Sequence, residues 1–276
     1  MLANIVSFWS GPVSYLERVC GASMHAQGNP VAVYSYSPEL IEAAGLPVEV
    51  RDACTVLPLD GEVQRIARAK PAVVADMFRL ELMRRGLGVW LDLDIVQVAP
   101  LPKPAAPIFA VEGTKGKINN AALYLPQDSP LLAEMLRFVG TRPVMAPWWT
   151  GKRRLKHSIA GMIGRPIPPE NCQWGVFGPK ALTWYVDQCG LRTQAAGPET
   201  FYPVAWDDRA DLVENTDISA RITAGTIGVH LWANGLRKLI AEQGIHRQSF
   251  LAKTAARYGV DLPADKLRGI DEAPAP

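Results

Sequence analysis

The sequence is poor in cysteine, and its cysteines are not paired. The four cysteines are Cys20, Cys54, Cys172 and Cys189, and no two of them form a Cys-x-x-Cys motif. A structural zinc site needs ligands at such close spacing, and a chain of this length does not depend on disulfides to fold. We therefore expect buried free thiols in a reducing compartment and no structural zinc.

Long hydrophobic runs and an excess of one charge are also missing. No apolar run reaches the ~18 residues that a membrane-spanning helix requires. Residues 4–9 read as a strand, where a signal peptide would need a basic segment. The net charge is +2, which gives no reason to expect nucleic acid as a partner. These absences predict a cytoplasmic protein whose contact with the inner membrane is at most peripheral.

The rest of the composition is that of a globular protein. Hydrophobic residues make up 48% and charged residues 20% of the 276 positions, which is enough to bury a substantial core. We find no internal repeat and no low-complexity linker. We expect one domain over residues 1–270 and a disordered tail over residues 271–276, and the oligomeric state stays open.

Apolar runs and helical patterns alternate along the chain. Strands are predicted at residues 4–9, 31–36, 48–50, 89–91, 108–111, 121–125 and 226–232. Helices are predicted at residues 14–28, 38–44, 71–85, 130–139 and 181–188, with two more after residue 235. Residues 146–157 are predicted to be irregular. The alternation of strand and helix indicates an α/β fold with a mostly parallel central sheet flanked by helices.

Residues 71–96 carry the main candidate for chemistry. Pro71 suits the first turn of a helix, and Gly86 suits the position just after its last turn. A short apolar strand then leads to Asp92 and Asp94, whose carboxylates would share one side of an extended backbone. Paired carboxylates suit Mg²⁺ or Mn²⁺, above all when a substrate phosphate completes the coordination shell.

The residues around Asp92 and Asp94 bear on whether this pair is a functional site. Asp-x-Asp triplets are common by chance, and a pair of exposed loop aspartates is the simpler interpretation. An internal strand of an α/β sheet, however, ends where such sheets bind ligands. Asp76 and Arg79 lie three residues apart on the preceding helix and share one face of it, although a solvated ion pair would explain them equally well.

A longer pattern surrounds the aspartate pair. Residues 75–94 begin Ala-Asp-Met-Phe-Arg and end Gly-Leu-Gly-Val-Trp-Leu-Asp-Leu-Asp. This resembles the sugar-binding region of the family-32 glycosyltransferases, S/A-D-x-x-R-…-G-G-x-Y-x-D-x-D, a family that includes bacterial capsule enzymes and α-1,4-galactosyltransferases. The sequence departs from the family pattern in two places. Leu87 separates two glycines that are adjacent in the family, and Ala233 separates Trp232 from Asn234, which follow each other in the family's His-x-Trp-Asn motif. Other segments resemble the family in the same order, at residues 8–17, 119–121, 177–183, 201–203 and 229–232.

The resemblance implies a GT-A-type nucleotide-sugar-binding fold and a metal-dependent, retaining transfer of a hexose. The donor would be a nucleotide-diphosphate sugar, UDP-linked in preference to GDP-linked, and the acceptor a hydroxyl of a glycan or glycolipid. Asp92 and Asp94 would hold Mn²⁺ or Mg²⁺, which assists departure of the diphosphate. Asp76 would accept hydrogen bonds from the donor sugar, and Arg79 would hold the sugar or the diphosphate through its guanidinium.

The resemblance also assigns the outer parts of the site. Asn119, or the asparagine after it, would contact the sugar during transfer, although a plain turn is the simpler interpretation. Trp9 would stack on the nucleobase, and His230 and Trp232 would close over the diphosphate and metal. For Trp9 and His230, an ordinary structural role is the alternative. No carboxylate stands out as a covalent nucleophile, and Glu112 is the only nearby candidate by its order in the chain. Retention of configuration at the sugar is therefore implied by the family resemblance and not by these residues.

Two other functions compete with transfer. Residues 91–96 also fit the D-x-D-x-T/V pattern of haloacid-dehalogenase-type phosphatases, in which Asp92 would be the nucleophile and Asp94 the general acid. Asp207 and Asp208 would imitate the late acidic pair of those enzymes. That nucleophile strand normally opens its fold, whereas here ~90 residues of strand and helix precede it. A catalytically inactive carbohydrate-binding protein is the third interpretation.

A basic run at residues 152–156 follows the pair Trp148 and Trp149. The cations would meet an anionic glycan, a lipid diphosphate or an anionic membrane surface. The tryptophans would stack on acceptor sugars or anchor the loop. A solvated basic face is the simpler interpretation of the run.

Overall fold

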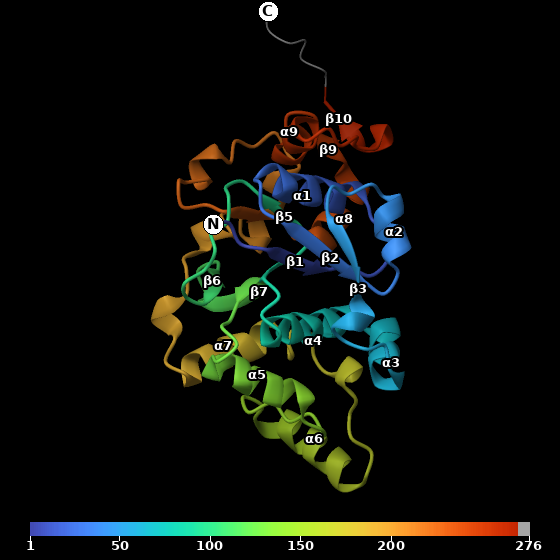
Figure 1. Cartoon of the computed structure of the whole chain (residues 1–276), viewed down its shortest axis with the longest axis vertical. Helices are drawn as coiled ribbons and strands as arrows, with labels where there is room; N and C mark the ends of the chain where they lie inside the picture. The colour runs from blue at the N-terminus through green and yellow to red at the C-terminus, as the bar shows by residue number, and fades with distance from the viewer. Residues whose placement is uncertain (270–276) are drawn as a thin grey trace, which may run out of the picture.

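The computed structural model describes residues 1–269, so the predicted tail over residues 271–276 lies outside the described residues. The central sheet contains β1 (Ile5–Phe8), β2 (Val31–Ser35), β3 (Glu49–Asp52), β4 (Val89–Leu91), β6 (Ile108–Glu112) and β7 (Lys117–Tyr124). Their order is β3-β2-β1-β4-β7-β6 (Figure 1). The first four strands in this order are parallel, and β7 and β6 are antiparallel to their neighbours. The predicted α/β fold with a mostly parallel sheet is confirmed.

Helices cover both faces of this sheet (Figure 1). One face carries α1 (Tyr15–Ala26), α8 (Ala233–Gln243) and α9 (Phe250–Arg257), and the other carries α3 (Gly61–Ala69), α4 (Pro71–Arg84), α5 (Pro130–Gly140) and α7 (Pro179–Gln188). A short helix, α2 (Pro38–Ala43), precedes β3. Ile5 and Val33 point into the first core, whereas Val6 and Ala32 point into the second. Because β2 and β4 are buried along their whole length, their sequences are nearly continuous apolar runs, whereas the edge strand β3 is largely exposed and polar.

Two local signals position the elements that lead to the site. The backbone N–H of Ser14 donates to the Glu17 carboxylate at 2.7 Å, and the Ser14 hydroxyl accepts from the N–H of Leu16 at 3.3 Å, which completes the predicted start of α1. Gly88 has φ +150°, and a Cβ there would lie 2.5 Å from the Asn4 carbonyl oxygen. Glycine therefore allows β4 to pair closely with β1.

The structure differs from the sequence prediction in three places. Helix α3 is absent from the prediction, because only Val63 and Ile66 of its residues are buried. The predicted strand at residues 226–232 is outside the central sheet, since β8 (Gly228–His230) pairs antiparallel with the unpredicted β5 (Ile95–Gln97). The predicted irregular region is wrong in part, because α6 (Gly151–Met162) begins within it. Only His157 of α6 is buried, so the apolar residues of this helix do not form a core-facing stripe.

The chain ends its described part with a small parallel pair, β9 (Ile245–His246) and β10 (Leu267–Arg268). Across residues 1–269, every helix is too short or too polar to cross a membrane. All four cysteines are free, as predicted. The expectation that they are buried is met by Cys20 and Cys172 and is wrong for Cys54, which is exposed.

Candidate active site

The aspartate pair lies in a tight turn at the carboxyl end of β4, beside β1. The N–H of Ile95 donates to the carbonyl of Asp92 at 3.1 Å, so the backbone turns between the aspartates and the expectation of an extended backbone is wrong. The turn runs directly into β5. Pairing of β5 with β8 places His230 opposite Ile95 and therefore next to Asp94. The turn thus gathers groups that are far apart in the sequence.

Asp94 connects this turn to the start of α8. Its Oδ1 lies 3.1 Å from Nε2 of His230, and its Oδ2 accepts a hydrogen bond at 3.0 Å from the N–H of Ala233, the first residue of α8. The positive end of the helix dipole favours a carboxylate at this position. The Asp94 side chain keeps 18% of its surface exposed, which leaves one edge open to a ligand.

Trp232 forms the junction between β8 and α8. Its backbone is left-handed, with φ 55° and ψ 45°. A bulky residue in this conformation costs on the order of 1–3 kcal/mol and persists only where its surroundings hold it. Here the indole N–H donates to the carbonyl of Val204 at 2.9 Å, and the ring stands edge-on to His230 with 4.1 Å between centroids. Trp232 therefore fixes both His230 and the start of α8.

A second set of contacts centres on Arg79 of α4. Its Nη2 lies 3.2 Å from Oδ1 of Asp92 and 3.7 Å from Oδ1 of Asp76. Its guanidinium lies 4.5 Å from the centroid of the Trp90 ring, whose N–H donates to Asp92 at 2.6 Å. Asn120 of β7 donates from its amide to Asp76 at 2.9 Å and accepts from Arg79 at its backbone carbonyl. Asp76 and Asp92 are thus held by one cation between them.

The two sets meet at Asp92, and the carboxylates outnumber the cations. Burial raises the pKa of Asp92 to about 6, with Arg79 opposing the shift and the charge of Asp94 adding to it. Burial raises the pKa of Asp76 despite Arg79. Burial acts in the same direction on Asp94, but the charge and hydrogen bond of His230 outweigh it and lower the Asp94 pKa. Against the effect of burial, Asp94 raises the pKa of His230.

Asp92, Asp94 and His230 have the composition of a divalent-cation site. One ligand atom of each lies within 4.8 Å of the other two, and residues 1–269 contain no second such group of His, Cys, Asp or Glu. The Nε2 atom of His230 faces Asp94, and its Nδ1 atom is buried without a hydrogen-bond partner within residues 1–269. Two carboxylates and one imidazole suit Mn²⁺ or Mg²⁺, with the imidazole favouring Mn²⁺. These residues therefore fit the predicted metal.

Trp9 lies just beyond the carboxyl end of β1, the strand beside β4. Its indole N–H donates to the carbonyl of Pro12 at 3.2 Å, and the Arg237 guanidinium lies 5.9 Å from its ring. The ring is half-buried, so one part of it is open to solvent. Within residues 1–269, its hydrogen bond and its cation contact join it to Pro12 and Arg237 rather than to the acidic residues, so its role in binding a base stays a prediction.

Asn119 and Glu112 form a separate pair on β7 and β6. The Asn119 amide donates to the Glu112 carboxylate at 2.5 Å, and its carbonyl oxygen accepts from the N–H of Ala121 at 2.8 Å. Glu112 also pairs with Lys117 at 3.2 Å. Of the two neighbouring asparagines, Asn120 is therefore the one in contact with Asp76.

Trp90 and Gly178 are two site residues that the sequence analysis missed. Trp90 stands two residues before Asp92, and strand alternation was a signal that both face one side. Gly178 precedes α7, where a Cβ would lie 2.4 Å from Oδ1 of Asp76. That close approach joins segments far apart in the sequence, so spacing alone could not reveal it.

Comparison with known proteins leaves the family open. No protein-family model matches the chain, and no curated protein matches its sequence. Among solved structures, one match is titled "PaToxG Glycosyltransferase", with 14% sequence identity, 67% of each chain covered and a TM-score of 0.43. This likeness is too distant to assign a family or a function.

Proposed function

We propose that this protein is a metal-dependent glycosyltransferase that moves a hexose from a nucleotide-diphosphate sugar to a hydroxyl of a glycan or glycolipid. The observation that carries the proposal is the position of Asp92 at the carboxyl end of β4, 3.2 Å from Arg79 and with a ligand atom within 4.8 Å of those of Asp94 and His230. Ligands of open α/β sheets bind at this edge. The carboxylates of Asp92 and Asp94, which would bind a cation, and the guanidinium of Arg79, which would bind a phosphate, lie together at this edge.

Asp92 and Asp94 would hold the divalent cation, with His230 as the third ligand. Once bound, the cation would neutralise the charge of the departing diphosphate. His230 and Ala233 keep Asp94 in place, and Trp90 and Arg79 keep Asp92 in place. The protein thus fixes both carboxylates through their hydrogen bonds before any ligand arrives.

Asp76 and Arg79 supply the grip on the donor. Asp76 accepts hydroxyl hydrogen bonds, and its position is set by Asn120 and Arg79. Arg79 presents a planar fork that matches a phosphate or a sugar diol. The first N–H groups of α8 lie beside Asp94 and favour the diphosphate by their dipole. UDP-sugars remain the preferred donors, and retention of configuration remains the expectation from the family resemblance.

The phosphatase alternative receives less support from the geometry. A phosphatase of that type needs Asp94 as its general acid, but the Asp94 carboxylate is paired with His230, which outweighs the effect of burial and lowers the Asp94 pKa. Its late acidic pair would be Asp207 and Asp208, and both are exposed on a short 3₁₀ helix. Asp76, Asp92 and Asp94, the acidic residues that the family resemblance assigns to the site, are all present, which argues against an inactive carbohydrate-binding protein.

The test is a screen of nucleotide sugars with the full chain. UDP or GDP together with Mn²⁺ should raise the melting temperature, and one nucleotide sugar should be hydrolysed only when Mn²⁺ is present. Phosphatase turnover with no shift by any nucleoside diphosphate would overturn the proposal. Sugar affinity without metal-dependent turnover would instead identify a binding protein.

A further inference from the structure

Helix α6 carries an apolar stripe that faces away from the protein. Leu155, Ile159, Met162 and Ile163 are 58%, 44%, 75% and 64% exposed. Their spacing of four, seven and eight residues from Leu155 places them on one side of the helix. A contiguous exposed apolar surface of this kind marks an interaction site more often than scattered apolar residues do.

The opposite side of α6 attaches the helix to the rest of the chain. His157 is buried, and its ring centroid lies 4.1 Å from that of Trp149. A Cβ at Gly161 would lie 3.3 Å from Pro143. At 100° per residue, His157 and Gly161 lie on the far side of the helix from Leu155. A surface helix normally buries its apolar stripe against the core. In α6 the apolar stripe faces solvent instead, and it has no partner within residues 1–269.

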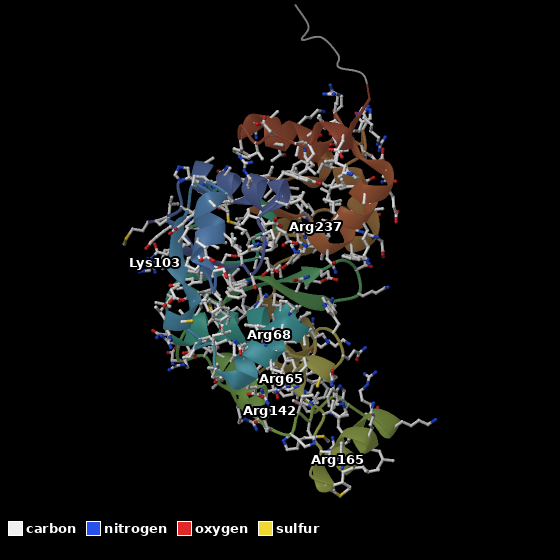
Figure 2. All side chains as sticks on the ribbon, turned by 90° about the vertical axis from the view of Figure 1, so that its right-hand side faces the viewer. Arg65, Arg68, Lys103, Arg142, Arg165 and Arg237 are labelled. Atoms are coloured by element: carbon white, nitrogen blue, oxygen red, sulfur yellow. The ribbon has the colours of Figure 1, made fainter. Side chains whose placement is uncertain are left out.

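Cations surround this stripe. Lys152, Arg154, Lys156 and Arg165 are exposed, and none of them has an ion-pair partner within residues 1–269. Arg154 and Lys156 flank the stripe on its two sides. Residues 135–169 contain no aspartate or glutamate at all. Figure 1 places α6 at one end of the long axis, and Figure 2 shows Arg142 and Arg165 at that same end.

We propose that α6 docks on the surface of an anionic phospholipid bilayer. The apolar stripe would enter the boundary between headgroups and acyl chains, and the flanking cations would meet the lipid phosphates. A second copy of this chain is a poor partner for this face. Two α6 helices packed together would bring their cations into contact, and residues 135–169 of neither copy contain an acidic side chain to neutralise them. No residue of the acidic centre belongs to α6, so the inference does not depend on the proposed transferase activity.

The experiment is co-sedimentation of the full chain with phosphatidylcholine vesicles prepared with and without phosphatidylglycerol. Two α6 variants remove either the stripe or the charge, namely L155S/I159S/M162S and K152Q/R154Q/K156Q. The matched control removes three exposed cations elsewhere, R18Q/K103Q/K238Q. Figure 2 shows Lys103 far from α6. All substituted side chains are exposed, so melting curves should stay close to wild type and verify folding.

Wild type and the control should bind vesicles that contain phosphatidylglycerol and ignore pure phosphatidylcholine. The charge variant should bind on the order of 100-fold more weakly, about fivefold for each cation lost, and the stripe variant should also lose binding. Absence of wild-type binding to anionic vesicles would overturn the inference, as would an equal loss in the control. A dimer in sedimentation equilibrium that the stripe variant dissolves would assign the face to self-association instead.

Discussion

The Arg79 guanidinium lies 3.2 Å from the Asp92 carboxylate, and only 7% of the Arg79 side chain is exposed. The same guanidinium lies 3.7 Å from Asp76. One buried cation therefore serves two carboxylates that come from different elements, α4 and the turn after β4. Removing one partner of such a set leaves uncompensated buried charge, which links the stability of the fold to the geometry of the site.

Arg79→Met should destabilise the protein by about 3 kcal/mol, because Asp76 and Asp92 would lose their shared cation. Arg79→Lys should cost less stability but still weaken nucleoside-diphosphate binding, since an ammonium lacks the planar fork. Urea unfolding measures the first effect, and titration with UDP or GDP measures the second. Arg137→Met, which breaks an exposed pair with Glu134, is the control and should cost far less stability. An Arg79→Met variant as stable as that control would contradict the argument.

Asp94→Asn should abolish Mn²⁺-dependent stabilisation by nucleoside diphosphates. The amide keeps the size of the side chain but removes the charge, and it leaves His230 without its ion-pair partner. Donor hydrolysis should fall by at least ~100-fold, since changes even in the groups around metal ligands cost 10–100-fold. Calorimetry with Mn²⁺ and an assay of released nucleoside diphosphate measure the two effects.

Asp207→Asn is the matched control for that experiment, because Asp207 is exposed and distant in the sequence from the aspartate pair. It should change neither Mn²⁺ binding nor turnover. Loss of activity in both variants would instead favour the phosphatase alternative, in which Asp94 is the general acid and Asp207 belongs to the late acidic pair.

The sequence was sufficient for the parts of the fold that are governed by local patterns. Strand β1 and helix α4 follow from an apolar run and from Pro71 with Gly86. Helix α6 was missed because no acidic residue marks its first turn, although Leu155, Ile159 and Met162 recur at helical spacing. The pairing of β5 with β8 also escaped prediction, since it joins residues far apart and depends on the turn at Asp92.

The same distinction applies to the candidate site. Asp76 and Arg79 were recognisable from their spacing on one helix, and Asp92 and Asp94 from the strand before them. The proximity of Asn120 to Asp76 depends on the antiparallel pairing of β7 with β4, which spacing does not encode. The sequence does not encode the distances between residues on different helices and strands, so these contacts could not be predicted from it.

Gly178→Ala should disturb Asp76, because the added Cβ would lie 2.4 Å from its carboxylate oxygen. We expect a loss of about 1–3 kcal/mol of stability, as for other overpacked positions, and weaker donor binding. Gly61→Ala is the control, since a Cβ there meets nothing within 4 Å and the position starts helix α3. It should be neutral or slightly stabilising. Equal melting temperatures for the two variants would show that the space at Gly178 is not needed.

In the metal-free protein, the contribution of Asp92 to stability should decrease as the pH rises from about 4 to about 7. Burial raises the Asp92 pKa to about 6, so the folded chain holds this proton more tightly than the unfolded chain does. The stabilising contribution is therefore complete below the unfolded pKa and disappears as the pH passes the folded one. Its size should be on the order of 2 kcal/mol, allowing for the partial exposure of the side chain.

Urea unfolding in EDTA at a series of pH values measures this contribution. Asp92→Asn cannot titrate, so the stability difference between variant and wild type should grow in favour of the variant as the pH rises. Mn²⁺ should reverse the trend in wild type, because a cation between Asp92 and Asp94 replaces the proton as the neutralising charge. A difference between wild type and variant that stays constant with pH would mean that Asp92 is already ionised at low pH. Burial of the Asp92 charge, with the charge of Asp94 beside it, would then not be what prepares the site for a cation.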